Sequence, residues 1–152
     1  MTLAIDLTGR AILCVGATKG IARACVESMA QAGAALALVS RDTGTLERLG
    51  AELREKYRSD IMTIVADATD DSALKAAIAS SIAHYGNTLS GLAPLVGSWN
   101  RGAPLHELTD EDWLFGYERI LLPVVRSCRY VLPHFVQRGG GSIVTLGAYS
   151  YA

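Results

Sequence analysis

The feature that most constrains the fold is a regular alternation of short apolar runs with longer amphipathic segments. Short apolar runs bounded by glycine or polar residues predict buried strands; they lie at residues 10–15, 35–39, 61–65, 89–96 and 142–146. Segments with apolar residues three and four apart predict helices; they lie at residues 20–32, 43–57, 70–85 and 112–137. This alternation predicts a single α/β domain over residues 1–152, with parallel strands, right-handed crossovers and helices on both faces of the sheet.

Composition limits the classes of function that this chain can have. Half of the 152 residues are hydrophobic and 19% are charged, which is typical of a globular protein. The net charge of −1 provides no basic surplus for binding nucleic acid or an anionic membrane surface. No apolar run is long enough for a membrane helix, and residues 1–9 do not resemble a signal peptide.

The cysteines and histidines give no sign of a disulfide framework or a metal site. Cys14, Cys25 and Cys128 lie far apart and form no Cys-x-x-Cys pair. They also have no metal-ligand spacing with any of the three histidines. We therefore expect reduced thiols, no bound metal and a cytoplasmic location.

The turn after the first predicted strand is rich in glycine and opens a helix. It contains Gly16, Thr18, Lys19, Gly20 and Ile21. Such a turn lets the backbone approach a pyrophosphate, which the free N–H groups and dipole of the helix then favour. The sequence therefore predicts that these five residues bind a dinucleotide; the alternative is a tight strand–helix turn with close packing.

Side chains beyond this turn also fit a nucleotide. Arg41, after Ser40 at the end of the second strand, suits a ribose 2′-phosphate, and Lys19 could close on the same group. The alternative is that both cations are solvated at the surface. Asp67, just after the third strand, could accept a hydrogen bond from an adenine amino group; alternatively it caps the helix that starts near Asp70.

Six motifs occur in order between residues 7 and 147: CVGATKGIA, VSRD, VADATD, LTDEDW, RYVLPHF and GGGSIVTLG. In these motifs the chain resembles the short-chain dehydrogenase/reductase family. The resemblance implies a doubly wound parallel Rossmann sheet, NAD or NADP as cofactor, and oxidation or reduction of hydroxyl and carbonyl groups. Lys19 and Arg41 match the members that prefer NADP.

The cofactor motifs depart from the family pattern. Val15 stands at the Thr position of T-G-x-x-x-G-x-G, and Ala22 replaces its third glycine. The family's N-N-A-G after the fourth strand is here Pro94-Leu95-Val96-Gly97, so only Gly97 remains as a cofactor-binding candidate. In the family the Thr hydroxyl is tied to that Asn-rich segment. Both ends of the tie are apolar here, which indicates a rebuilt site with weakened or lost NADP binding.

The catalytic positions implied by the resemblance depart further. The family's Asn aligns with Ile120 and its Ser with Ala148; Ser150 could substitute only if its loop were shifted. Tyr-x-x-x-Lys does not occur, and the family's Tyr would be expected past residue 152. We therefore predict no catalytic residue in this chain, and we expect it to be the first part of a longer protein that has further strands and substrate-binding helices.

The predicted helix over residues 112–137 suggests a partner. Its stretch over residues 120–125 is apolar almost all round, which predicts burial on more than one side. Pro123 is expected to kink it. The resemblance implies that this helix packs against another subunit, in a homo- or hetero-oligomer; the alternative is an ordinary core helix.

Three functions remain open. The first is a non-catalytic subunit that supports an active dehydrogenase sibling, whose substrate has a hydroxyl or carbonyl group and could be an acyl-CoA. The second is an active NADP-dependent oxidoreductase whose Tyr–Lys pair lies beyond residue 152. The third is a nucleotide-binding module. Val15, Pro94, Ile120 and Ala148 favour the first, whereas Lys19, Arg41 and Asp67 favour the other two.

Overall fold

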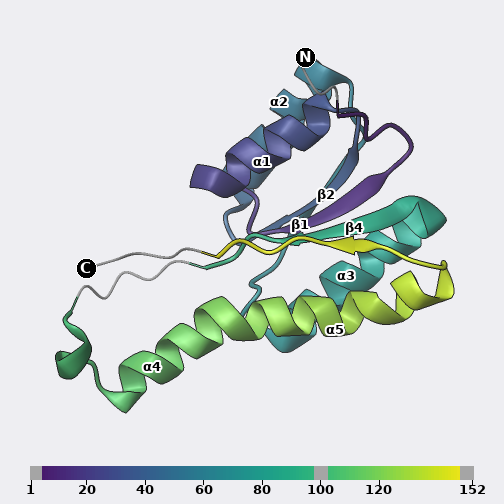
Figure 1. Cartoon of the computed structure of the whole chain (residues 1–152). Coiled ribbons are helices and arrows are strands. Elements are labelled where there is room, and N and C mark those ends of the chain that lie inside the picture. Colours follow the sequence, from purple (N-terminus) through teal and green to yellow (C-terminus); the bar gives the residue numbers. More distant parts are fainter. Residues whose placement is uncertain (1–4, 98–102, 148–152) are drawn as a thin grey trace.

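The strands form one parallel sheet, which confirms the predicted fold class. The computed structural model describes residues 5–97 and 103–147. Its strand order is β3-β2-β1-β4-β5 (Figure 1). The bounds are β1 (Ala11–Val15), β2 (Ala35–Ser40), β3 (Ile61–Val65), β4 (Leu89–Pro94) and β5 (Ser142–Ile143). The chain moves outward from β1 to β2 and β3, and then returns to the other side of β1, so that the strand order reverses between β1 and β4.

Helices cover both faces of this sheet. Figure 1 shows α1 (Gly20–Gln31) and α2 (Thr43–Tyr57) on one face, and α3 (Asp71–Tyr85) and α5 (Leu122–Gln137) on the other. This is the doubly wound arrangement of the Rossmann fold. Within the described ranges no helix is long and apolar enough to cross a membrane.

The alternating side chains of the central strands form two separate cores. Leu13 and Val15 pack toward α3 and α5, in one cluster with Val131 and Phe135. Cys14, between them, packs into the other cluster, on the side of α1 and α2. All three cysteines are free, and burial raises the pKa of the Cys14 thiol to about 12.

Short polar side chains set the starts of α2 and α3. The Asp42 carboxylate accepts a hydrogen bond from the Thr45 N–H at 3.0 Å, and the Asp70 carboxylate accepts one from the Ala73 N–H at 3.0 Å. Each carboxylate satisfies an amide that has no partner within the helix. Because Asp70 caps α3, the alternative role proposed for Asp67 was wrong.

The helix predicted over residues 112–137 is longer and less regular than expected. It begins two residues earlier, with α4 (Asp110–Gly116), because Thr109 and Asp112 form a reciprocal capping box. A π-helical turn, η3 (Tyr117–Leu121), connects α4 to α5. Pro123 lies in the first turn of α5, so its missing N–H falls at this irregular turn.

The apolar stretch over residues 120–125 is not buried on every side in this chain. Pro123 is buried, but the side chains of Leu121 and Val125 are 52% and 39% exposed. One side of the helix therefore packs on the domain, and the other presents apolar side chains to its surroundings.

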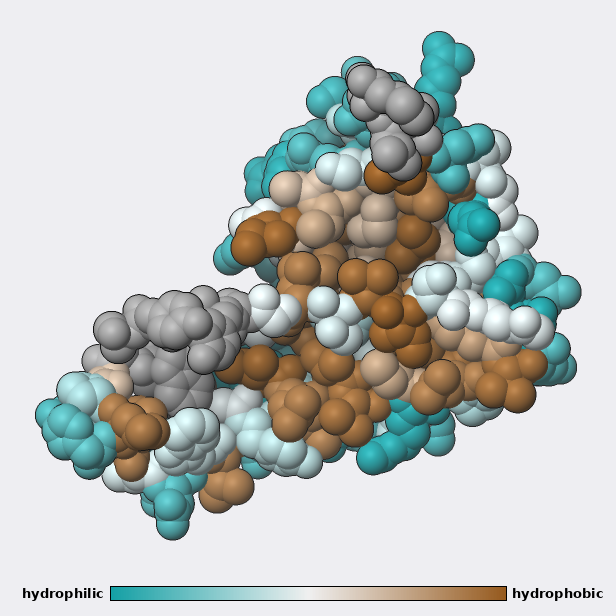
Figure 2. Space-filling view, viewed as in Figure 1, coloured by the Kyte–Doolittle hydropathy of each residue, from teal (hydrophilic) through white to brown (hydrophobic). Residues whose placement is uncertain are grey.

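Two strands are shorter than predicted. β4 ends at Pro94 rather than at residue 96, although the Leu95 N–H still donates to the Val15 carbonyl at 2.8 Å. β5 ends at Ile143 rather than at residue 146, where Val144 and Leu146 are 62% and 51% exposed. Figure 2 shows apolar side chains gathered over the sheet between α1 and α5. They line a groove of about 520 Å³, to which Ile12, Ile21, Leu95, Val144 and Leu146 contribute.

The packing of α5 predicts a position-dependent cost of shortening its valines. Val131 is fully buried, so Val131→Ala should lower the free energy of unfolding by about 2 kcal/mol through lost burial and a residual cavity. Val136, on the same helix, is 78% exposed, so Val136→Ala is the matched control and should leave it nearly unchanged. Urea denaturation of the two variants measures the difference; equal losses would contradict the packing described.

Candidate functional site

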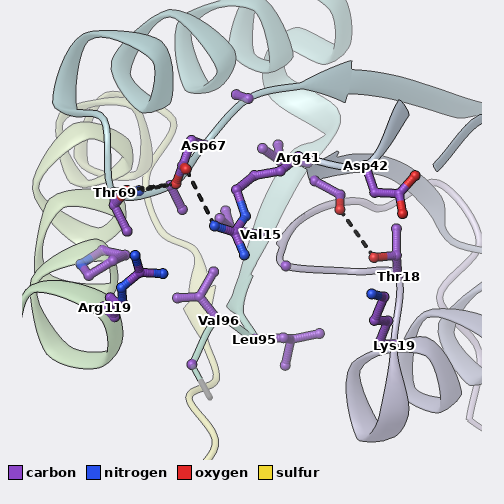
Figure 3. A pocket seen from close by; sticks show the side chains of 17 residues that line it. Val15, Thr18, Lys19, Arg41, Asp42, Asp67, Thr69, Leu95, Val96 and Arg119 are labelled. Atoms are coloured by element: carbon purple, nitrogen blue, oxygen red, sulfur yellow. Dashed lines mark hydrogen bonds and ion pairs between the residues drawn. The ribbon is translucent and has the colours of Figure 1, made fainter. Parts of the chain in front are cut away.

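A cleft opens where the strand order reverses, at the carboxyl ends of the central strands. This switch-point cleft has a volume of about 270 Å³ and is lined by residues that follow β1, β2, β3 and β4 (Figure 3). Its lining includes six of the eight predicted cofactor residues: Gly16, Thr18, Lys19, Arg41, Asp67 and Gly97. In open α/β sheets, ligands bind at this position.

The other two predicted residues lie in the first turn of α1. Gly20 opens the helix with a φ of +55°, beside the cleft but not in its lining. The side chain of Ile21 is 70% exposed and lines the apolar groove over β4 and β5 instead. The helix turns the Ile21 side chain away from the cleft, so its predicted contact with a cofactor would be made by the backbone N–H at the helix N-terminus, and that contact stays a prediction.

One end of the cleft has the geometry of a phosphate site. Gly16 has a φ of +87°, and a Cβ there would approach Val96 Cγ1 to 2.9 Å, so this position requires glycine. Nothing lies within 4 Å of the Cβ position of Gly20, which leaves open space over the start of α1. Lys19, the N-cap residue, makes no side-chain cap, so the first amides of α1 can donate to an anion.

Hydroxyl groups and Arg41 border this end on the β2 side. Thr18 Oγ1 and Ser40 Oγ share a hydrogen bond of 3.1 Å, which joins the glycine-rich turn to the end of β2. The Arg41 guanidinium, 63% exposed, lies 3.5 Å from the Asp67 carboxylate. The predicted cation and carboxylate are therefore brought together across the cleft.

The turn after β3 fixes Asp67. Its Oδ1 accepts from the Thr69 N–H at 2.8 Å and from the Thr69 hydroxyl at 2.7 Å. Partial burial acts to raise the pKa of Asp67, but the hydrogen bonds from Thr69 and the charge of Arg41 outweigh it, so that the pKa lies below its ordinary value. Asp67 is thus a positioned carboxylate with Oδ2 turned toward Arg41.

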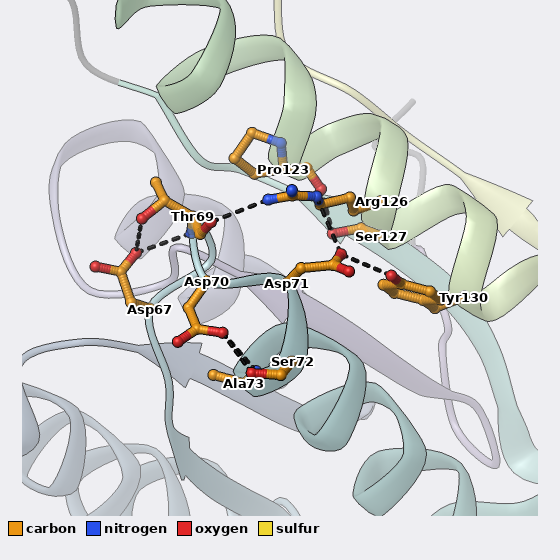
Figure 4. Close-up of polar contacts among 10 residues, drawn as sticks. All are labelled: Asp67, Thr69, Asp70, Asp71, Ser72, Ala73, Pro123, Arg126, Ser127 and Tyr130. Atoms are coloured by element: carbon orange, nitrogen blue, oxygen red, sulfur yellow. Dashed lines mark hydrogen bonds and ion pairs between the residues drawn. The ribbon is translucent and has the colours of Figure 1, made fainter.

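Side chains of α5 anchor this turn from behind (Figure 4). Arg126 donates to the Thr69 carbonyl at 2.9 Å and pairs with the Asp71 carboxylate at 3.0 Å. The Tyr130 hydroxyl donates to Asp71 at 2.6 Å, which raises the pKa of Tyr130. The turn that carries Asp67 is therefore tied to α5.

The floor of the cleft is apolar where the resemblance implies a polar tie. Val15 and Leu95 are joined through their backbones, at 2.8 Å. Gly97 has a φ of +132°, and a Cβ there would lie 3.3 Å from Cγ2 of Ile120. Hydrocarbon contact thus replaces side-chain hydrogen bonding between these segments.

Ile120 lies in the π-turn, beside the cleft floor. Ala148 and Ser150 lie outside the described residues. Among the described residues, no group of three His, Cys, Asp or Glu side chains could hold a metal ion. Tyr85, the most perturbed tyrosine with a pKa raised to about 12 by burial, donates to the Leu36 carbonyl at 3.0 Å and has a structural role.

Among the lining residues that sequence reasoning missed, Arg119 is a cation. It reaches the switch-point cleft from the π-turn between α4 and α5. Its position in a helical segment, four residues after Phe115, could not indicate this. Side chains of a π-turn point in other directions than those of a regular helix, and the sequence does not reveal a π-turn.

Comparison with known proteins agrees with this fold. The model of the short chain dehydrogenase family matches residues 10–150. Galactitol 2-dehydrogenase of Rhizobium johnstonii is 31% identical over 144 residues, which are 95% of this chain and 55% of that protein. Cis-2,3-dihydrobiphenyl-2,3-diol dehydrogenase of Paraburkholderia xenovorans is 27% identical, over 93% of this chain and 51% of its own length.

A solved structure shows the same architecture. L-sorbose reductase of Gluconobacter frateurii, in complex with NADPH and L-sorbose, superposes with a TM-score of 0.85 at 26% identity, covering 94% of this chain and 54% of that one. The chain belongs to the short-chain dehydrogenase family, whose members are oxidoreductases that bind NAD(P). It spans about half the length of the curated relatives that it matches.

The Asp67 turn predicts a specific shift in acidity. Thr69→Val removes the hydroxyl donor but keeps the amide, so the pKa of Asp67 should rise toward its ordinary value of 3.8. Since the folded pKa is lowered, the stability that Asp67 contributes is present above the ordinary pKa and is lost as the pH falls through the folded value. Carboxyl carbon NMR titration measures the pKa of Asp67 in the wild type and in Thr69→Val.

A matched control is available at the start of α2. There the Thr45 hydroxyl donates to the Asp42 carboxylate at 3.0 Å, and Thr45→Val should shift Asp42 while leaving Asp67 unchanged. An unaltered Asp67 titration in Thr69→Val would show that the hydroxyl does not hold this carboxylate.

Proposed function

We propose that this chain is a non-catalytic subunit of the short-chain dehydrogenase type, which binds NADP in the cytoplasm and supports an active dehydrogenase sibling. The sibling would act on a hydroxyl or carbonyl substrate, such as an acyl-CoA. The observation that carries the proposal is the packing of Ile120 against Gly97, at the position where the resemblance implies a catalytic Asn.

The chemistry of proton transfer explains why an isoleucine at this position favours a non-catalytic role. Proton transfer to a substrate oxygen needs donors and acceptors held within hydrogen-bond distance. Ile120 has no hydrogen-bonding group, and its side chain packs against Gly97, beside the floor of the cleft. Val15 and Leu95 extend the same apolar surface. An ordered water of a proton relay would find no side-chain partner on this surface.

Binding of NADP is supported by the charges of the cleft. Lys19 and Arg41 line it together with Thr18 and Ser40, and Arg41 suits a ribose 2′-phosphate. Gly20 leaves open space at the N-terminus of α1, where the pyrophosphate would lie. The L-sorbose reductase complex contains NADPH, which agrees with this type of cofactor. When bound, NADP would supply hydride chemistry, but this chain's own contribution is binding.

Association is supported by the outer face of the helix over residues 112–137. Apolar side chains recur along it at spacings close to three, four and seven residues, and each is at least 39% exposed. They are Leu114, Tyr117, Leu121, Val125, Leu132 and Val136. An exposed stripe of this kind is typical of a subunit contact.

The alternative is an active NADP-dependent oxidoreductase whose Tyr–Lys pair lies beyond residue 152. The cations that line the cleft favour it, because they are suited to a cofactor. Native mass spectrometry of the protein isolated from its source tests the proposal. We expect this chain together with a second, different dehydrogenase-like subunit. A homo-oligomer that oxidises NADPH in the presence of carbonyl compounds would overturn the proposal in favour of the alternative.

The proposed role of Arg41 predicts a change in cofactor preference. Arg41→Met removes a charge-assisted contact of about 1.5–3 kcal/mol to the 2′-phosphate, so the Kd of NADP⁺ should rise about 20-fold while that of NAD⁺ stays within about twofold. Isothermal titration calorimetry measures both. Arg48→Met, an exposed cation of α2 outside the cleft lining, is the control and should resemble the wild type. Equal weakening of both nucleotides would show that Arg41 does not contact the 2′-phosphate.

The exposed stripe predicts an effect of charged substitutions on the oligomer. Leu121→Asp combined with Val125→Asp introduces two charges that a subunit contact would have to desolvate, so the oligomer should dissociate to monomers. Light scattering coupled to size-exclusion chromatography measures the mass. Leu105→Asp, on a side chain 71% exposed but outside this helix, should leave the mass unchanged. A double variant that stays as large as the wild type would place the interface elsewhere.

A further inference from the structure

The two ends of the switch-point cleft differ in chemistry. The glycine-rich turn, Lys19 and the N-terminus of α1 form one end and are suited to phosphate. At the other end lie Asp67 and Thr69, together with Arg119, which Figure 3 shows across the cleft from Lys19. Arg119 is assigned no role by the cofactor motifs, yet it adds a third cation to the lining.

Arg119 is held over an aromatic ring. Its guanidinium carbon lies 4.5 Å from the centroid of the Phe115 ring, one turn earlier in the chain. That distance is within the range of a cation–π contact, which restrains a long side chain. The extra residue of the π-turn between α4 and α5 shifts the facing of the following residues by roughly 100° relative to a regular helix. Arg119 belongs to this turn, from which it enters the cleft lining.

The surroundings of Arg119 favour a flat aromatic ligand over an anion. The negative charge of Asp67 shares this end of the cleft, and its Oδ2 can accept from an amino group on the edge of a ring. Hydrocarbon from Ala66, Val96 and Pro123 lines the same cleft. A guanidinium is planar and weakly hydrated, and it stacks on aromatic faces.

We propose that Arg119 is a binding residue for the purine ring of the nucleotide, with its guanidinium against the ring and Asp67 at the amino edge. This inference rests on the proposed NADP binding and adds Arg119 to the residues that would contact the base. Arg41 and Arg119 then have separate tasks: Arg41 selects the 2′-phosphate, and Arg119 contributes to every ligand that carries the base.

The test is calorimetric binding of NADP⁺, NAD⁺ and inorganic pyrophosphate to the purified chain. Arg119→Met should raise the Kd of both nucleotides by the same factor, about fivefold, because both contain the base. The Kd of pyrophosphate should not change. The slope of log Kd against log salt concentration should match the wild type, since no phosphate contact is lost. Arg119→Lys keeps the charge without the planar face and should remain close to Arg119→Met.

Arg129→Met is the matched control, because Arg129 is an exposed cation of α5 outside the cleft lining; it should bind all three probes as the wild type does. Circular dichroism spectra check that each variant is folded. Unchanged nucleotide binding by Arg119→Met would overturn the inference alone, as would a loss confined to NADP⁺ or a weakened pyrophosphate complex with a shallower salt slope. If the wild type bound neither nucleotide, the proposed NADP binding would fail together with this inference.

Discussion

Two backbone hydrogen bonds fix the end of β1 and, with it, the position of the cleft. The Val15 carbonyl accepts from Leu95, and the Gly16 N–H donates to the Val39 carbonyl, so both neighbouring strands hold the chain at the same point. With so little space beside it, Gly16 leaves the sheet with a positive φ and directs the chain into α1. The switch-point cleft lies beside this turn, because β2 and β4 flank β1 on opposite sides and the strand order reverses there.

The cleft therefore combines the backbone geometry of a Rossmann fold with an apolar floor. Its rim keeps polar and charged groups, among them Thr18, Lys19, Arg41 and Asp67. Its floor is hydrocarbon from Val15, Leu95 and Val96, with Ile120 beside it. In the proposed function, rim contacts would bind a nucleotide by its phosphates and base, whereas proton transfer needs polar groups at the reacting end. Binding and catalysis are thus separable in this fold, because different strands and helices supply the groups for each.

Local patterns predicted what depends on local interactions. The strand–helix alternation and the glycine-rich turn follow from the periodicity of apolar residues and from glycine placed directly after a strand. The facing of Ile21, the π-turn and the entry of Arg119 into the cleft could not be predicted, because each depends on the phase of a helix relative to the sheet. The start of α4 was missed for a different reason: the capping box of Thr109 and Asp112 is visible in the sequence, but the apolar pattern that defined the helix begins later.

The helix α5 connects the two parts of the proposed function. On its inner side, Arg126 and Tyr130 hold the turn that carries Asp67, through Thr69 and Asp71. On its outer side it presents the apolar stripe. A subunit packed on the stripe would therefore restrain the same helix that orders the base end of the cleft. Partner binding and nucleotide binding would then stabilise each other, because each reduces the freedom that the other must remove.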